Sequence, residues 1–137
     1  MDFKREYRDE ILTISVNLKR ATFLEANSFN EILVEEIGNG YRKFVVDLSS
    51  CSFVDPIFIG VIIMTLKKLT ALKGSLKIII PEIGFNLEKN TINSLRVFET
   101  YQSKNAALES FKKKIIIQYE ESNHIMGMPP LEASFSV

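Results

Sequence analysis

The sequence has few of the residues from which catalytic and metal sites are built. Its 137 residues include a single cysteine, Cys51, and a single histidine, His124. One cysteine cannot form an intramolecular disulfide, which suits the reducing cytoplasm where we expect the chain to reside. Cys51 has no histidine near it in the sequence, so we expect a plain, partly buried thiol. A metal site needs several ligands at suitable spacing, and because none cluster we expect no metal.

Several binding and targeting signals are also missing. The chain has neither G-x-G-x-x-G nor a P-loop, so no phosphate-binding turn and no cofactor are indicated. The 17 basic and 17 acidic residues cancel, and no basic stripe suggests nucleic acid. The charged start, Met1-Asp2-Phe3-Lys4-Arg5-Glu6, lacks a signal-peptide core. The longest strongly apolar run, 57–64, is far shorter than the ~20 residues that span a bilayer, so we expect no membrane insertion.

What is present is the pattern of one α/β domain. Apolar residues make up 46% of the chain, enough for a single core. Short β-branched runs alternate with segments of helical spacing, which predicts a mixed, mostly parallel central sheet with helices packed against it. The strands are expected at 2–8, 11–16, 44–48, 76–80 and 97–101, and the helices from Thr22 to about 37, from Asp55 to about Lys73, from 87 to about 95, and after Ser103.

Two helix starts are marked by capping residues. Thr22 and Glu25 form a capping box, in which each side chain can bond the backbone N–H of the other. Asp55 can cap the next helix, and Pro56 then occupies its first position, where a fixed φ fits and a missing N–H costs nothing. We assign residues 1–114 to the domain. Residues 115–137 form a C-terminal extension that could continue the last helix, add a strand or be a flexible tail.

The stretch from Phe44 to Ile63, followed by Gly74-Ser75-Leu76, carries a family resemblance. A strand ending in Asp47-Leu48, a short loop, the phrase Phe53-Val54-Asp55-Pro56-Ile57-Phe58-Ile59-Gly60 and an apolar helix follow in that order. This arrangement resembles the STAS domain, the fold of anti-sigma factor antagonists, whose corresponding phrase is F-[VIM]-D-S-S-G-L-G. The resemblance covers about residues 3–114. It implies a non-catalytic protein that binds an anti-sigma factor or a related kinase-like regulator.

The sequence departs from the family at the position that matters for regulation. In antagonists of this type, a partner kinase phosphorylates the serine directly after the aspartate. Pro56 occupies that position here, Ile57 occupies the next, and neither has a hydroxyl. The glycine that usually follows is Phe58. The chain therefore keeps the helix start and lacks the usual phosphorylation switch. Ser49, Ser50 and Ser52 lie nearby but do not match the family position.

The helix that begins at Pro56 has two distinct faces. At 100° per residue, one face can contact the sheet, and the other combines apolar residues with lysines, which indicates an interaction patch. The alternative is that Ile57 and Met64 are covered by a loop or by the C-terminal extension. We expect partner binding through the loop and helix at residues 53–68, at Asp55, Pro56, Ile57, Gly60, Met64, Lys67 and Lys68.

Three functions fit the sequence to different degrees. The first is a protein-binding relative of anti-sigma factor antagonists without the serine switch. The second is an accessory STAS subunit of a transport system, or a scaffold of a larger STAS assembly. The third is an enzyme or a small-ligand carrier on a flavodoxin-like sheet, which would require a tightly bound small molecule. The sequence leaves open whether the chain forms a homo-oligomer.

Overall fold

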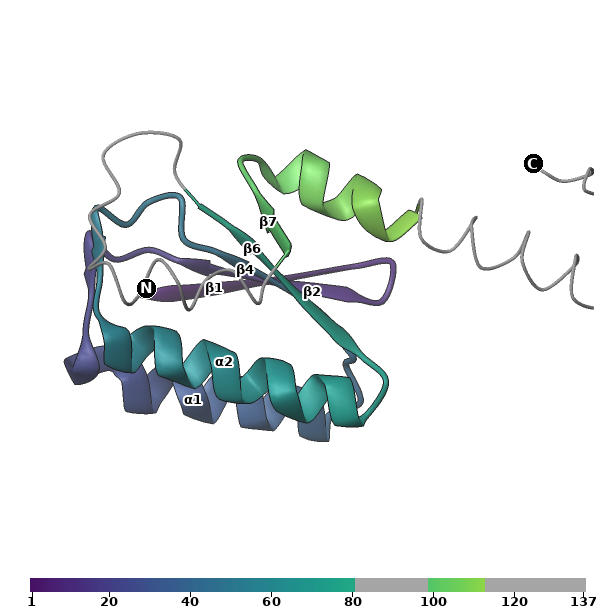
Figure 1. The fold of residues 1–137 in the computed structure, drawn as a ribbon, viewed down its shortest axis with the longest axis horizontal. Helices are drawn as coiled ribbons and strands as arrows, with labels where there is room; N and C mark the ends of the chain where they lie inside the picture. The colour runs from purple at the N-terminus through teal and green to yellow at the C-terminus, as the bar shows by residue number, and fades with distance from the viewer. Residues whose placement is uncertain (81–98, 113–137) are drawn as a thin grey trace, which may run out of the picture. The chain divides into compact units, whose positions relative to one another are not determined.

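The structure is a computed structural model that describes residues 1–80 and 99–112. Strands and helices alternate along most of this part of the chain, as the sequence predicts (Figure 1). By its contacts the chain divides into two compact units, Met1–Ala107 and Leu108–Val137, and the strands and the two long helices lie in the first. These elements are β1 (Phe3–Arg8), β2 (Ile11–Val16), β3 (Arg20–Ala21), α1 (Phe23–Gly38), β4 (Lys43–Asp47), β5 (Phe53–Val54), α2 (Pro56–Ala71), β6 (Ser75–Ile79) and β7 (Glu99–Tyr101).

The first two strands form a tight hairpin. β1 and β2 pair antiparallel along their full six-residue lengths. The two residues between them, Asp9 and Glu10, have φ of 53° and 66°. A type I′ turn requires positive φ at both central positions, and its twist matches that of the strands it joins. The predicted edge strand and its hairpin partner are therefore confirmed.

The main sheet is mixed and mostly parallel. Its strand order is β1-β2-β4-β6-β7, and every pair except β1-β2 is parallel. Val45 and Val46 in β4 are both fully buried. Because successive strand residues point to opposite faces, both faces of the sheet are covered at this strand. The predicted fold class is confirmed.

The two long helices lie side by side on one face of the sheet (Figure 1). Aromatic side chains occupy the space between these helices and the sheet. The rings of Phe29 in α1 and Phe58 in α2 stack with their centroids 4.7 Å apart. Phe3 from β1 lies 5.1 Å from Phe29. Such ring pairs add to the stabilisation that burial provides, so they fix the position of α2 relative to α1 and β1.

The sequence did not predict the second, very small sheet. β3 and β5 contribute two residues each and pair in parallel, with Arg20 opposite Phe53 and Ala21 opposite Val54. The guanidinium of Arg20 also lies 4.3 Å above the Phe53 ring centroid. Two-residue strands are too short to show the alternation by which strands are recognised in a sequence.

Helix α2 ends slightly earlier than predicted. Its last residue is Ala71 rather than about Lys73, and Lys73 adopts a φ of 65°. Gly74 is required by close packing, because a Cβ atom there would lie 2.3 Å from the backbone oxygen of Arg42. The glycine therefore allows the start of β6 to lie against the chain that enters β4.

Some predictions lie partly or wholly outside the described residues. These are the helix at 87–95, the first two residues of the strand at 97–101, and the extension at 115–137. The last predicted helix is seen at 104–112, and Ser103 Oγ accepts a hydrogen bond from the Ala106 N–H at 3.1 Å. The domain boundary near residue 114 stays a prediction.

Candidate functional site

The small β3-β5 sheet fixes the backbone that leads into α2. The carbonyl oxygen of Lys19 accepts hydrogen bonds from the N–H groups of Ser52 and Phe53, at 2.8 and 3.2 Å. The N–H of Asp55 donates to the carbonyl oxygen of Ala21 at 2.9 Å. Asp55 is therefore held in place by a chain segment more than thirty residues earlier, as well as by the loop that directly precedes it.

The carboxylate of Asp55 caps both long helices. One oxygen, Oδ1, accepts a hydrogen bond from the Phe58 N–H at 2.8 Å, which is the predicted N-cap of α2. The other, Oδ2, accepts one from the Phe23 N–H at 2.8 Å, at the first residue of α1. The first N–H groups of a helix have no partner within the helix, and the N-terminal end carries partial positive charge. Asp55 supplies both an acceptor and a negative charge to the two ends at once.

The predicted capping box of α1 is also present. Thr22 Oγ1 accepts a hydrogen bond from the Leu24 N–H at 3.2 Å, and Glu25 Oε1 accepts one from the Thr22 N–H at 2.9 Å. Together with Asp55, these side chains satisfy the first donors of α1. The end of the domain that carries both helix starts is thus organised by three side chains, each with a defined partner.

Pro56 occupies the first position of α2, as predicted, and is exposed. Its ring fixes φ at a helical value and provides no hydroxyl. Ile57 follows and is 59% exposed. The structure therefore presents an apolar, unreactive surface where the family phrase places its serines.

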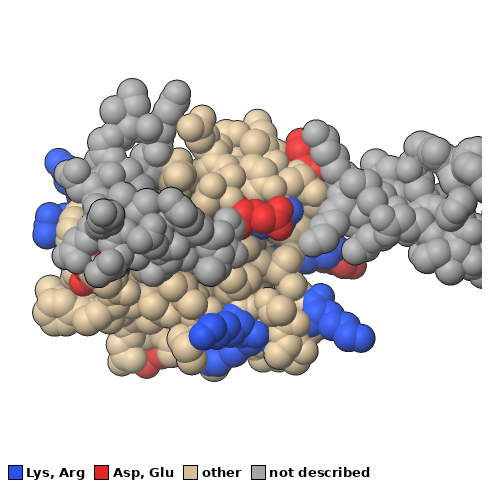
Figure 2. Space-filling model, viewed as in Figure 1, with Lys and Arg blue, Asp and Glu red and all other residues tan. Residues whose placement is uncertain are grey.

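The outward face of α2 is the one that the sequence predicts. Phe58, Ile59, Ile62 and Leu69 are buried against the core. On the other side, Met64 is 55% exposed, so the described structure does not cover it with a loop. In Figure 2, Lys and Arg atoms gather over the C-terminal half of α2, while its N-terminal half carries no charge. The predicted contact residues on this side, apart from Asp55 at the cap, are Pro56, Ile57, Gly60, Met64, Lys67 and Lys68, and their role in binding stays a prediction.

The sequence analysis missed two exposed residues beside this helix start. Phe23 is 60% exposed and Leu24 is 73% exposed, and they form the first two positions of α1. The capping box of Thr22 and Glu25 offered a signal for their exposure. Phe23 and Leu24 lie between its two members, and the residues of α1 that pack on the core come only after it. In the sequence, these positions are recognisable only as part of the cap, although their apolar side chains contribute nothing to capping.

Among the described residues, the remaining groups that could be reactive form no catalytic or metal site. Burial raises the pKa of the Cys51 thiol to about 11, so the thiol is protonated at neutral pH, as expected for an unreactive cysteine. Within residues 1–80 and 99–112, no group of three or more His, Cys, Asp or Glu side chains could hold a metal ion. In the same part of the chain, no helix has the length and apolar character needed to cross a membrane.

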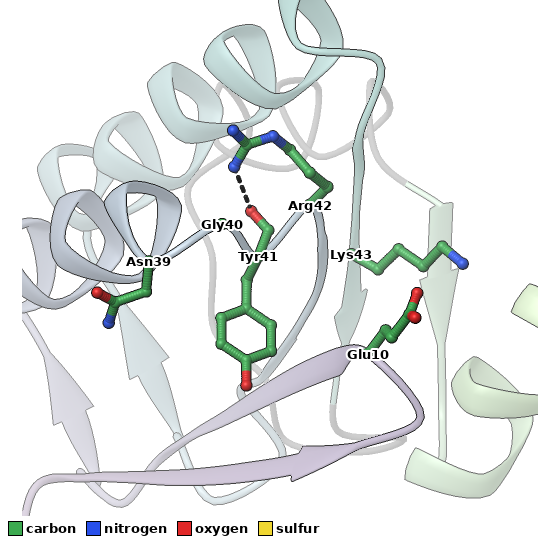
Figure 3. A pocket seen from close by; sticks show the side chains of 6 residues that line it. All are labelled: Glu10, Asn39, Gly40, Tyr41, Arg42 and Lys43. Atoms are coloured by element: carbon green, nitrogen blue, oxygen red, sulfur yellow. Dashed lines mark hydrogen bonds between the residues drawn. The ribbon is translucent and has the colours of Figure 1, made fainter.

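A pocket of about 400 Å³ lies at the opposite end of β4, next to the β1-β2 turn (Figure 3). The guanidinium group of Arg42, which lines this pocket, is already hydrogen-bonded. Its Nη1 donates to the carbonyl oxygens of Ile37 and Tyr41, at 2.9 and 2.8 Å. Figure 3 shows the Lys43 side chain extending away from Tyr41. The pocket therefore offers no converging set of free polar groups. It is lined by Glu10, Asn39, Gly40, Tyr41, Arg42 and Lys43.

Comparison with solved structures identifies the fold. An anti-sigma factor antagonist from Mycobacterium paratuberculosis superposes with a TM-score of 0.69 at 16% identity, over 79% of this chain and 91% of that one. A candidate anti-sigma factor antagonist from Thermotoga maritima gives 0.70 at 23% identity, over 79% and 92%. The phosphorylated form of SpoIIAA, a Bacillus cell fate determinant, gives 0.61 at 13% identity, over 80% and 98%.

These likenesses establish that the chain has the STAS fold of anti-sigma factor antagonists, as the resemblance in sequence predicts. No protein-family model and no curated protein matches the sequence. At identities below 25%, shared architecture does not carry over a partner or a mechanism, so the function must be argued from the surface itself.

Proposed function

We propose that this chain is a non-catalytic protein-binding module that acts as an anti-sigma factor antagonist without a serine phosphorylation switch. It docks on an anti-sigma factor, or a related kinase-like regulator, through the loop and helix at residues 53–68. The observation that carries the proposal is the outward face of α2, where Ile57 and Met64 are both more than half exposed. Exposed apolar residues close together on a rigid helix are typical of protein interaction sites.

The rigidity of the helix start supports a docking role. Asp55 is hydrogen-bonded through its N–H and through both carboxylate oxygens. Ile57 is therefore presented by a backbone that is already ordered before a partner arrives. Preorganised contact residues lose less conformational entropy on binding, which increases the affinity that a small apolar surface can provide.

The absence of a hydroxyl at Pro56 and Ile57 makes this docking surface constitutive. A phosphate would add a charge of about −1.5 to −2 at this helix start and oppose docking of an uncharged or acidic partner. The acidic side chain at this helix start is that of Asp55, whose oxygens are directed to backbone N–H groups. Binding is then not controlled by phosphorylation at residue 56 or 57.

The proposal is tested by a competition experiment. Each anti-sigma factor encoded in the same genome is purified in complex with its sigma factor, and the chain is added with ATP. The expected result is release of the sigma factor from at least one complex, persisting through prolonged incubation because no phosphate can be placed on residue 56 or 57. If no sigma factor is released from any complex, the proposed function is wrong.

A further inference from the structure

Four exposed apolar side chains lie on the helical layer, three in the first turns of its two helices and one, Met64, near the middle of α2. Apart from the N-terminal methionine, Leu24, Phe23, Ile57 and Met64 are the most exposed large apolar residues among those described, with 73%, 60%, 59% and 55% of their surface accessible. Single exposed apolar residues are common and need no explanation. Here two belong to α1 and two to α2, so the question is whether they form one surface.

Asp55 brings the two pairs together. Its two oxygens bind the N–H groups of Phe23 and Phe58, each at 2.8 Å, so these two nitrogens lie at most about 8 Å apart. Ile57 directly precedes Phe58, and Leu24 directly follows Phe23. The first turns of α1 and α2 are therefore adjacent, and Phe23, Leu24 and Ile57 occupy neighbouring positions at one end of the domain, while Met64 lies about two turns further along α2.

The apolar residues at the start of α1 have no role in the helix itself. The first turn of a helix is stabilised by acidic side chains and by capping groups, which Thr22, Glu25 and Asp55 already supply. Phe23 and Leu24 leave most of their surface in water and gain little from burial. Their apolar character is explained if a partner covers them.

The charge beyond this apolar end indicates the chemistry of the partner. α2 contains no acidic residue, and Lys67 and Lys68 are exposed about one turn after Met64. A partner segment that covers Ile57 and Met64 and continues along α2 meets two positive charges. Carboxylates at that point complement them, whereas basic residues are repelled.

We propose that Phe23 and Leu24 join Ile57 and Met64 in a single docking surface that crosses the starts of both helices and continues along α2 to Met64. The partner is a protein segment with apolar side chains facing this surface and carboxylates facing Lys67 and Lys68. This inference rests on the proposed function, because it takes the partner to be an anti-sigma factor and describes the part of it that binds.

The test compares two identical substitutions on α1. Leu24→Glu places a charge in the proposed surface, and glutamate at the second helix position suits the helix. Val34→Glu is the matched control, since Val34 is 48% exposed on the same helix, about 15 Å further along its axis. Both variants are titrated against the anti-sigma factor that binds the unaltered chain. We expect at least about tenfold weaker binding for Leu24→Glu and a change within about twofold for Val34→Glu.

The charge of the partner is tested with the double variant Lys67→Glu, Lys68→Glu. We expect about tenfold weaker binding at about 50 mM salt and a smaller difference at about 500 mM, because salt screens exposed charges. A loss that does not depend on salt, or tighter binding, would overturn the acidic partner segment. The unaltered chain is also tested for binding to phosphatidylglycerol vesicles. If it binds them and Leu24→Glu abolishes that binding, the surface is a membrane-binding site and the inference is wrong.

The outcomes separate this inference from the proposed function. If Met64→Glu abolishes binding to the anti-sigma factor while Leu24→Glu binds as well as Val34→Glu, the docking face is confined to α2 and only the inference is wrong. If the unaltered chain binds none of the anti-sigma factors, the proposed function is wrong and the inference falls with it.

Discussion

The Asp55 carboxylate accepts a hydrogen bond from the backbone N–H of Phe23, 32 residues earlier in the chain, at 2.8 Å. Its other oxygen caps α2 in the usual way through Phe58. One side chain therefore joins the starts of both helices that cover the sheet. Because the two oxygens have separate partners, we expect the free energy of unfolding to fall in two steps as one oxygen and then both are removed.

Replacing Asp55 tests the double cap. An asparagine has one oxygen and can keep only one of the two hydrogen bonds, while an alanine keeps neither. We expect Asp55→Asn to lower the free energy of unfolding by about 1 kcal/mol and Asp55→Ala by about 2 kcal/mol, measured by urea denaturation. Equal losses for the two variants would show that the bond which asparagine retains contributes nothing, and the double cap would be wrong.

A second prediction concerns Glu36, whose side chain is 1% exposed. Burial alone would raise the pKa of Glu36, but hydrogen bonds from Tyr7 Oη and Arg5 Nη1 hold that pKa below its ordinary value of 4.5. The carboxylate thus stabilises the fold above about pH 4.5. This contribution is lost as the pH falls through the lower pKa of the folded state.

We expect Glu36→Gln to lower the free energy of unfolding at pH 7 by about 1–3 kcal/mol. As the pH falls below about 4.5, the variant should lose less stability than the unaltered chain. Glu35→Gln is the control. Glu35 also reaches Arg5, at 3.3 Å, but its side chain is 58% exposed, so its loss should cost less than about 0.5 kcal/mol. Parallel pH profiles for the unaltered chain and Glu36→Gln would contradict this account.

Most of the fold could be predicted from the sequence because its signals are local. Capping residues at Thr22 and Asp55 mark the two helix starts, and the apolar run in β4 indicates a strand buried on both faces. The β3-β5 sheet was missed because each strand has two residues and is stabilised by pairing across more than thirty positions. No local pattern encodes such a contact.

In the candidate site, too, the features with a local sequence signal could be predicted and those that depend on long-range contacts could not. Helical periodicity separated the exposed face of α2, with Ile57 and Met64, from its buried face. The second bond of Asp55, to Phe23, depends on how α1 and α2 pack against each other and could not be inferred from one segment. For that reason the sequence alone does not predict that Phe23 and Leu24 lie beside the start of α2.

A third prediction addresses phosphorylation. When the chain is incubated with an anti-sigma factor kinase and ATP, mass spectrometry should find no stoichiometric phosphate on the Asp55–Gly60 segment, which has no hydroxyl. Pro56→Ser should gain phosphate at residue 56 if the kinase docks at this surface. It should cost less than about 1 kcal/mol of stability, because serine tolerates the first helical turn.

Ile57→Ser serves as the control for this experiment, since it adds a hydroxyl one position further along the helix. Phosphorylation of the Ile57→Ser variant but not of the Pro56→Ser variant would place the reactive position one residue later than the family phrase indicates. High-yield phosphate on Ser49, Ser50 or Ser52 in the unaltered chain would show that a switch exists in a displaced form, and the constitutive docking surface would be wrong.

The central claim is that the outward face of α2 binds a protein, and Met64→Glu tests it most directly. The measurement pairs a melting curve with a binding titration against the anti-sigma factor whose sigma factor the chain releases. Because Met64 is 55% exposed, we expect the free energy of unfolding to change by less than about 0.5 kcal/mol. A charge at the centre of the contact should weaken binding by about 2 kcal/mol or more, roughly thirtyfold. Unchanged stability with unchanged affinity would contradict the claim, because the partner would then dock elsewhere.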